Sequence, residues 1–222
     1  MLVMVKLLYV TANPKRPAVS KGMKIGEAFL ETFIKEQPDT EITHMDLFNL
    51  DMPWMDADLI SARGKMGGFG VKIDELPKHE KVKVKKMHAL ADEFISHDYF
   101  VFVSPLWNLS SPAVLKNFLD NLFISGKTFN YTATGPKGLL KNKKAIHIQT
   151  RGGVYTNTPM EQMESGDRYL KIALRFLGIE VMDSIVAEGL DAFPKMVPDI
   201  VAKAKQKAVL AAEEMARSTI QV

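Results

Sequence analysis

The chain has 222 residues, of which 46% are hydrophobic and 25% are charged, so it can bury a substantial core. This composition excludes a disordered chain, a collagen-like chain and a bundle of membrane spans. The absence of cysteine excludes disulfides, iron–sulfur clusters and cysteine nucleophiles, so any redox chemistry must use a bound cofactor. The net charge of +3 is far weaker than the basic surface of a nucleic-acid-binding protein, and we expect no nucleic-acid partner.

An apolar run from Leu2 to Val10, interrupted by Lys6, opens the chain. The run is too short for a transmembrane helix, and no small-residue cleavage site of a signal peptide follows it. We therefore interpret it as a buried first strand, and we expect a cytoplasmic protein that has no membrane partner.

The rest of the chain alternates between predicted strands and predicted helices. Apolar runs predict further strands at residues 40–47, 99–103, 144–149 and 179–187. Apolar residues spaced three and four apart predict helices at residues 20–35, 81–96, 113–124, 161–177 and 198–217. This alternation indicates an α/β fold with a doubly wound, five-stranded parallel sheet in the order 2-1-3-4-5 and helices on both faces.

Two stretches, at about 48–80 and 125–142, depart from this alternation and are too long to be plain loops. The second contains residues 128–132, which alternate like a strand. Because no linker or repeat interrupts the chain, we predict a single domain over residues 1–222. The two stretches also carry aromatic residues that we expect to be exposed and to form an interface between two copies of the chain, namely Trp54, Phe69, Phe129 and Tyr131.

Ligands of an open parallel sheet bind beyond the carboxyl ends of its strands. The loop after the first strand, residues 11–22, contains Asn13, two lysines and an arginine, and it leads into a helix at Ser20. The loop has neither the Rossmann glycine pattern nor that of a P-loop. Backbone amides and the helix dipole favour a phosphate at Ser20, Lys21 and Gly22, whereas Ser20 alone is also explained as a helix N-cap. Both interpretations can hold together.

Two further loops follow the third and fourth predicted strands. In residues 104–112, Trp107 either offers a flat face to a planar ligand or packs beneath the next helix. In residues 150–155, Arg151 adds a fixed positive charge, and the glycine pair after it either approaches a ligand closely or forms a plain turn. Because the three loops converge at one edge of the sheet, a mononucleotide with a planar ring system, such as FMN, fits them best.

Several linked motifs resemble the FMN-dependent NADH azoreductases, which also reduce quinones and have a flavodoxin-like fold. The motifs lie at residues 105–108, 115–120, 126–132, 135–139, 143–145 and 151–153. The resemblance runs from residues 9–12 to residues 187–189, which is nearly the whole chain. It implies a homodimer with FMN at the subunit interface.

The resemblance also implies roles for individual residues. The family's phosphate-binding turn corresponds to Ser20, Lys21 and Gly22, with Asn13 nearby. Its ring-binding residues and its loop at the pyrimidine edge of the flavin correspond to Leu106, Trp107, Asn108, Leu109, Thr150, Arg151, Gly152 and Gly153. Family members often have a serine in place of Gly22 and a phenylalanine in place of Leu109, so one hydroxyl contact and the pocket shape differ here. Tyr131 and Phe176 are candidates for the substrate pocket, although Phe176 is better explained as a core residue.

The resulting hypothesis is an FMN-dependent NADH oxidoreductase that reduces azo compounds and quinones. NADH reduces the flavin by hydride transfer and leaves, and the acceptor then takes two electrons at the same face in a ping-pong sequence. The hypothesis names no catalytic side chain, since solvent can supply the protons.

Two alternatives remain beside this hypothesis. A flavodoxin-type electron carrier would be a monomer with an acidic surface, which the charge of +3 and the two long stretches disfavour. A phosphate-ester hydrolase would need a nucleophile with a nearby carboxylate, and the first loop offers only Thr11 and Ser20 without one. The five histidines show no metal-ligand spacing, so we predict no metal site, and we interpret His147 as a hydrogen-bonded core residue.

Overall fold

The computed structural model describes residues 4–218. Leu2 and Val3, at the start of the predicted first strand, lie outside this range, as do the last four residues of the predicted domain. Among the described residues, no helix is both long and apolar enough to cross a membrane.

The parallel sheet has the order β2-β1-β3-β6-β7, which confirms the predicted arrangement of five strand positions. Its four long strands are β1 (Lys6–Thr11), β2 (Glu41–Asp46), β3 (Tyr99–Pro105) and β6 (Lys144–Thr150). The central strand β3 is buried along its whole length, because helices cover both faces of the sheet. The carboxyl ends of β1, β3 and β6 therefore meet at one edge of the sheet.

The fifth strand position is occupied by two short strands, so the prediction of one continuous strand at 179–187 was wrong. β7 (Glu180–Val181) pairs with the start of β6, and β8 (Ile185–Ala187) pairs with its end. Between them the chain leaves the ladder, and the Ser184 hydroxyl donates to the Asp167 carboxylate at 2.5 Å. Two adjacent polar residues, Asp183 and Ser184, thus lie between the two short strands, and Ser184 has its partner outside the sheet.

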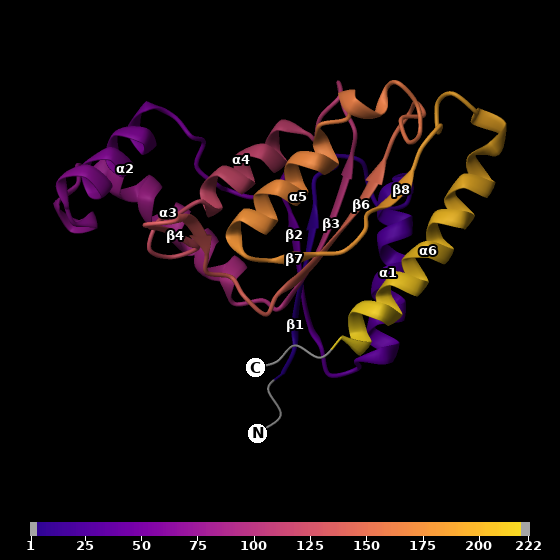
Figure 1. Ribbon diagram of the computed structural model, residues 1–222, viewed down its shortest axis with the longest axis horizontal. Helices are drawn as coiled ribbons and strands as arrows, with labels where there is room; N and C mark the ends of the chain where they lie inside the picture. Colours follow the sequence, from indigo (N-terminus) through magenta and orange to yellow (C-terminus); the bar gives the residue numbers. More distant parts are fainter. Residues whose placement is uncertain (1–3, 219–222) are drawn as a thin grey trace.

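Helices lie on both sides of the sheet (Figure 1). Two clusters of buried apolar residues hold these helices against it. One face is covered by α1 (Lys21–Glu36) and by α6 (Val197–Arg217), which follows the short 3₁₀ helix η3 (Pro194–Met196). Buried alanines at 204, 208 and 212 repeat every four residues along α6 and allow it to approach α1 closely. The other face is covered by α3 (Lys78–Ile95), α4 (Ala113–Leu122) and α5 (Gly166–Leu177).

Helix α5 begins five residues later than the predicted start at residue 161. Residues Glu161–Met163 form a separate 3₁₀ turn, η2, and Met163 is 45% exposed. The Glu164 carboxylate accepts a hydrogen bond from the backbone N–H of Asp167 at 2.8 Å, which satisfies a free amide in the first turn of α5. The segment before Gly166 is therefore a structured loop above the sheet edge.

The long stretch at 48–80 contains a helix that the sequence analysis did not predict, α2 (Ala57–Phe69), and the short 3₁₀ helix η1 (Ile73–Glu75). The Asp56 side chain caps α2 by accepting from the N–H of Leu59 at 3.1 Å, and Gly70 ends it with a φ of 68°. Lys83 of α3 donates to Asp56 at 2.5 Å and to Asp58 at 2.6 Å, so ion pairs hold α2 beside α3. Helix α2 projects at one end of the molecule in Figure 1, at the left.

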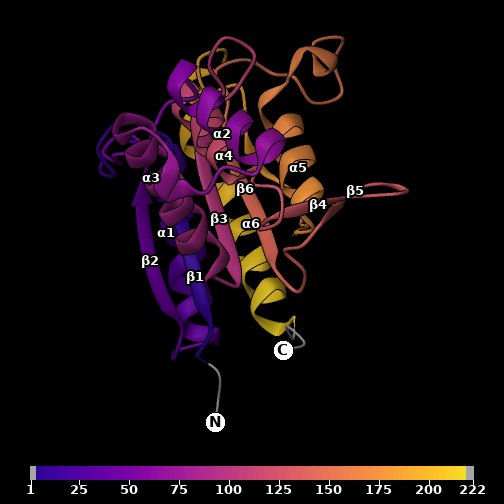
Figure 2. The same ribbon diagram turned by 90° about the vertical axis from the view of Figure 1, so that its left-hand side faces the viewer.

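The stretch at 125–142 forms a hairpin of β4 (Phe129–Thr132) and β5 (Gly135–Gly138), which projects from the body of the molecule (Figure 2). The predicted strand at 128–132 is confirmed, and its partner strand was not predicted. Tyr131 is 75% exposed on the hairpin, but Phe129 is only 5% exposed. The expectation that Phe129 is exposed was wrong, because its ring packs against Phe123 and Phe176.

Candidate functional site

The loops that follow β1, β3 and β6 surround one cavity of about 150 Å³, which we call the central cavity. The predicted site residues among its lining residues are Asn13, Ser20, Lys21, Leu106, Trp107, Thr150, Arg151 and Gly152. Asn108, Leu109, Gly22 and Gly153 adjoin these residues in the chain but do not line the cavity. The side chains of Tyr131 and Phe176 are not among the lining residues either.

Ser20 is the N-cap of α1, as one of the two interpretations predicted. Its Oγ accepts hydrogen bonds from the N–H of Met23 at 3.3 Å and from Asn13 Nδ2 at 3.2 Å, and the residue is 1% exposed. Asn13 in turn accepts from the N–H of Lys15 at 3.0 Å. This short network fixes the loop after β1 against the start of α1, so the loop approaches the central cavity in a defined conformation.

The side chains of Lys15, Arg16 and Lys21 form no hydrogen bond or ion pair within the described part of the chain. Lys15 and Lys21 line the central cavity beside the N-terminus of α1. The helix dipole adds positive potential at the same place. These features fit a phosphate group, which is the expected occupant of this end of the cavity.

Gly22 explains how α1 comes so close to the other two loops. A Cβ atom at this position would lie 3.3 Å from Val103 Cγ1 and 3.4 Å from Thr150 Cγ2. Position 22 therefore faces strands β3 and β6, and a side chain there would point at the sheet. A side chain at this position would have little room between helix and sheet.

The turn after β3 is a tight reversal at Trp107–Ser110. These two residues exchange backbone hydrogen bonds of 2.8 and 3.0 Å, and the central residues Asn108 and Leu109 have φ values of 47° and 70°. This is the left-handed conformation of a type I′ turn, which asparagine tolerates but which costs a leucine roughly 1–2 kcal/mol. The Leu109 carbonyl accepts from the N–H and the hydroxyl of Ser165, at 2.9 and 2.7 Å, and these bonds hold the strained turn in place.

Trp107 lies at the edge of the cavity and not beneath the following helix. Its side chain is 42% exposed, and its ring meets Phe48 edge to face with the centroids 6.3 Å apart. The N–H of Leu106, one residue earlier, donates to the Thr150 carbonyl at 2.8 Å and joins the two loops. A flat aromatic surface is thus available beside backbone groups of two loops, as a planar ligand requires.

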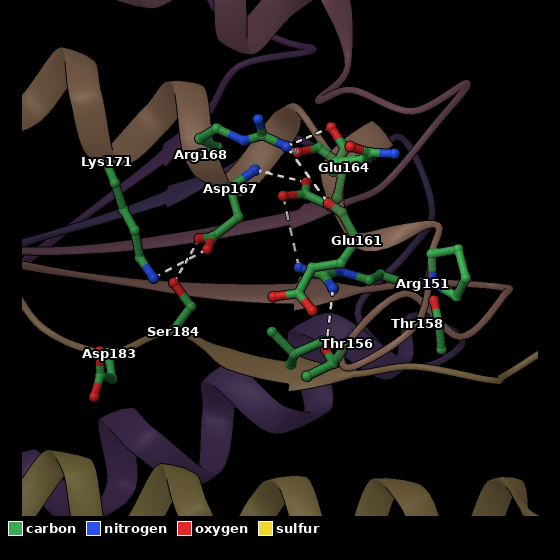
Figure 3. Close-up of a pocket in the computed structure, with 13 residues that line it drawn as sticks. Arg151, Thr156, Thr158, Glu161, Glu164, Asp167, Arg168, Lys171, Asp183 and Ser184 are labelled. Atoms are coloured by element: carbon green, nitrogen blue, oxygen red, sulfur yellow. Dashed lines mark hydrogen bonds and ion pairs between the residues drawn. The ribbon is translucent and has the colours of Figure 1, made fainter.

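Arg151 differs from the expectation of a fixed positive charge offered to a ligand. It is 6% exposed, its Nε donates to Gln149 at 2.6 Å, and one of its other nitrogens lies 3.3 Å from Glu188. Its remaining nitrogen lies 3.8 Å from Glu164 (Figure 3). Two carboxylates therefore compensate its charge. Burial alone would raise the pKa of Glu188, but hydrogen bonds from the amides of Tyr155 and Thr156 and the charge of Arg151 hold that pKa below its usual range.

The backbone of Arg151 also joins the loop that contains Gly152 to the fifth strand position, because its N–H donates to the Ala187 carbonyl at 2.8 Å. A Cβ atom on Gly152 would lie 2.2 Å from Asp191 Oδ2, and the Gly152 carbonyl accepts from the N–H of Asp191 at 2.9 Å. Asp191 also lines the central cavity, and the sequence analysis did not predict it. Asp191 could have been predicted as a site residue, because it lies in the loop after the fifth strand position. The carboxyl end of that strand lies at the same edge of the sheet as those of β1, β3 and β6.

A larger cavity of about 870 Å³ lies beneath residues 156–164 (Figure 3). Its cationic side chains have partners in the protein: Lys171 lies 3.0 Å from Asp167, and Arg168 donates to backbone carbonyls of 162 and 164 at 2.6 and 2.8 Å. A cavity whose cations are already paired is a poor site for an anionic ligand.

His147 lies behind this cavity, and the prediction that it is a hydrogen-bonded core residue is confirmed. It is 1% exposed, its Nδ1 donates to Asp167 Oδ1 at 2.8 Å, and its Nε2 lies 2.9 Å from Ser104 Oγ. Although this resembles a hydrolase triad, Ser104 is 1% exposed and lines none of the cavities described here, so a substrate has no access to it. Within residues 4–218, no group of three or more histidine, aspartate or glutamate side chains is arranged to hold a metal ion.

Comparisons with known proteins agree on one family. A family model described as "Flavodoxin-like fold" matches residues 5–211. The chain is 43% identical to an "FMN-dependent NADH:quinone oxidoreductase" of Staphylococcus haemolyticus, over 97% of this chain and 100% of that protein. It is 44% identical to "FMN-dependent NADH:quinone oxidoreductase 2" of Bacillus subtilis, over 91% of this chain and 98% of that protein.

Solved structures of azoreductases are also similar to this chain. An FMN-dependent NADH-azoreductase of Bacillus anthracis in complex with FMN has a TM-score of 0.86 and 31% sequence identity, over 96% of this chain and 100% of that one. A second azoreductase structure from Bacillus anthracis has a TM-score of 0.87 and 33% identity, over 95% of this chain and 100% of the other.

Proposed function

The chain belongs to the family with a flavodoxin-like fold, and from this premise we propose that it is an FMN-dependent NADH oxidoreductase that reduces quinones and azo compounds. The observation that carries the proposal is the convergence of the loops after β1, β3 and β6 on the central cavity, in a chain whose relatives carry these activities in their names. The electron-carrier alternative is disfavoured, because those relatives are named as oxidoreductases with their own substrates.

The residues present fit FMN. Lys15, Lys21 and the N-terminus of α1 supply unpaired positive charge for its phosphate, and Trp107 with the loop at Gly152 supplies a flat surface and close backbone for its ring. When bound, the flavin supplies the hydride chemistry. The loops after β3 and β6, which are held by Ser165 and by Arg151, would hold the ring between them with little reorganisation.

The visible spectrum of the purified protein tests the cofactor assignment. We expect a yellow protein that releases FMN, and not FAD, after heat or acid treatment. A colourless protein that takes up no added FMN would contradict the proposed function.

Ser20→Ala tests the place of the phosphate. The variant should lose about 1 kcal/mol of stability with its helix cap and should also bind FMN more weakly. Asp56→Ala removes the cap of α2, outside the site, and should reduce stability without changing flavin affinity. Equal flavin affinity in Ser20→Ala and in the wild type would exclude this position for the phosphate.

We propose further that the active unit is a homodimer. Trp54, Phe69 and Tyr131 are 58%, 85% and 75% exposed on the two projecting stretches, which supports an interface between copies. If the partner helps to enclose the flavin, FMN should strengthen dimerisation, because a ligand stabilises the state that binds it. Sedimentation of the FMN-free and FMN-bound protein over a dilution series tests this, and a fully active monomer would contradict it.

We also propose a cytoplasmic location, which is supported by the lack of cysteine.

A further inference from the structure

A cavity of about 560 Å³ lies between the carboxyl ends of β1 and β2 and helix α1, and we call it the β2 cavity. It shares Asn13 and Lys15 with the central cavity. Phe48 on its wall meets Trp107 of the central cavity, with ring centroids 6.3 Å apart. The two cavities are therefore neighbours, and the β2 cavity has the size of a small-molecule site.

The walls of the β2 cavity carry flat rings. Tyr9 and His44 meet edge to face with their centroids 5.2 Å apart, and Phe48 is 38% exposed. Burial, with a smaller contribution from the charge of Glu27, raises the pKa of Tyr9, so its ring stays neutral. Such rings provide apolar faces and edges for a planar heteroaromatic group.

A carboxylate stands at the position where nucleotide-binding sheets contact ribose. Asp46 is the last residue of β2 and lines the β2 cavity. Its Oδ1 accepts from the N–H of Phe48 at 3.0 Å and its Oδ2 from Asn49 Nδ2 at 2.6 Å, which leaves further lone pairs free. In α/β sheets that bind NAD, an acidic residue at this place accepts a hydrogen bond from the ribose 2′-hydroxyl.

Two positively charged side chains also line the β2 cavity. Lys15 and Arg16 line it, and neither side chain has a hydrogen bond or ion pair among residues 4–218. Arg16 does not line the central cavity, so it remains available to a second anion when the flavin phosphate is bound. A ligand with a planar base, a ribose and phosphate groups would match the rings, the carboxylate and the cations together.

We propose that the β2 cavity binds the adenylate half of NADH, with Asp46 accepting from the ribose hydroxyls and Arg16 facing the phosphates. This rests on the proposed function, because NADH is the molecule with all three groups that the enzyme must admit beside its flavin. Since the N-terminus of α1 serves the flavin phosphate, the donor needs no glycine-rich fingerprint here. The Asp46 carboxylate would repel a 2′-phosphate, so the enzyme prefers NADH to NADPH.

Titration of the FMN-loaded protein with ADP-ribose, which lacks the nicotinamide, tests the site directly. We expect ADP-ribose to bind without displacing FMN and to compete with NADH. Asp46→Asn keeps an oxygen for the Phe48 amide but removes the charge, and it should weaken ADP-ribose binding about fivefold to tenfold. Asp39→Asn, an exposed position before the other end of β2, is the matched control and should leave the affinity unchanged.

Kinetics provide the second measurement. In Asp46→Asn, the kcat/KM for NADH should fall relative to that for reduced nicotinamide mononucleotide, which has no adenylate, and the ratio of NADH to NADPH use should fall as well. Absence of competition between ADP-ribose and NADH would overturn the proposal. An equal loss of kcat/KM for NADH and for reduced nicotinamide mononucleotide would overturn it as well. ADP-ribose binding is measured without turnover, so a protein that oxidises no donor would contradict the proposed function and not this site.

Discussion

Replacement of Asp167 by alanine tests the buried polar network behind the larger cavity. The Asp167 side chain is 12% exposed, and its carboxylate lies 2.8 Å from His147 Nδ1, 2.5 Å from Ser184 Oγ and 3.0 Å from Lys171 Nζ. Alanine would leave a buried ring nitrogen and a nearby ammonium group without their acceptor. Removing one member of such a network costs about 3–5 kcal/mol, and we expect about 3 kcal/mol here because Lys171 can turn to solvent.

The effect should depend on pH in a defined direction. Burial alone would raise the pKa of Asp167, but the hydrogen bonds from His147, Ser184 and Lys171 hold that pKa well below its usual range. A carboxylate whose pKa is lower in the folded state contributes stability above the unfolded-state pKa of about 3.9 and loses it as the pH falls. The difference in unfolding free energy between wild type and Asp167→Ala should therefore shrink below about pH 4.

Urea unfolding at a series of pH values measures this difference. Asp120→Ala is the matched control, because Asp120 is also a helical aspartate and pairs with Lys116 at 2.5 Å on a more exposed surface. The control should change the free energy of unfolding by less than about 0.5 kcal/mol. A cost for Asp167→Ala below about 1 kcal/mol at pH 7, or a difference that stays constant down to pH 3, would refute the role assigned to the network.

Four further predictions concern three glycines and the order of turnover. Gly138→Ala should cost about 3 kcal/mol in thermal or urea unfolding, because its Cβ would lie 2.3 Å from backbone atoms of Leu177 and Gly178. Gly67→Ala, in α2 with no atom within 4 Å of its Cβ, should instead stabilise by about 0.5 kcal/mol. Gly152→Val should lower both flavin affinity and the stability of the FMN-free protein, since its Cβ would meet Asp191; an unchanged flavin affinity would place this loop away from the ring. Initial rates with NADH and a quinone should give parallel double-reciprocal lines, and intersecting lines would mean that both substrates bind together.

The sequence by itself determined the sheet order and the place of the central cavity. Continuous apolar runs such as 99–103 indicate a strand that is buried on both faces of the sheet. Apolar residues at helical spacing indicate a helix with one buried face, so local patterns are enough to predict these elements. The N-cap at Ser20 is also local, since it depends on a hydroxyl and an amide three residues away. Once strands and helices alternate, right-handed crossovers bring the loops after β1, β3 and β6 to the same edge of the sheet.

The tertiary structure decided the features that depend on distant residues. The charge of Arg151 is compensated by Glu188, which lies 37 residues away in the chain, and no local pattern reports that pairing. Helix α2 forms despite its glycines because Asp56 caps it and Lys83 of α3 binds it. The break between β7 and β8 likewise requires Asp167 as a partner for Ser184. Periodicity reports whether a residue is buried, but the partner of a buried charge or hydroxyl is fixed only when the chain has folded around it.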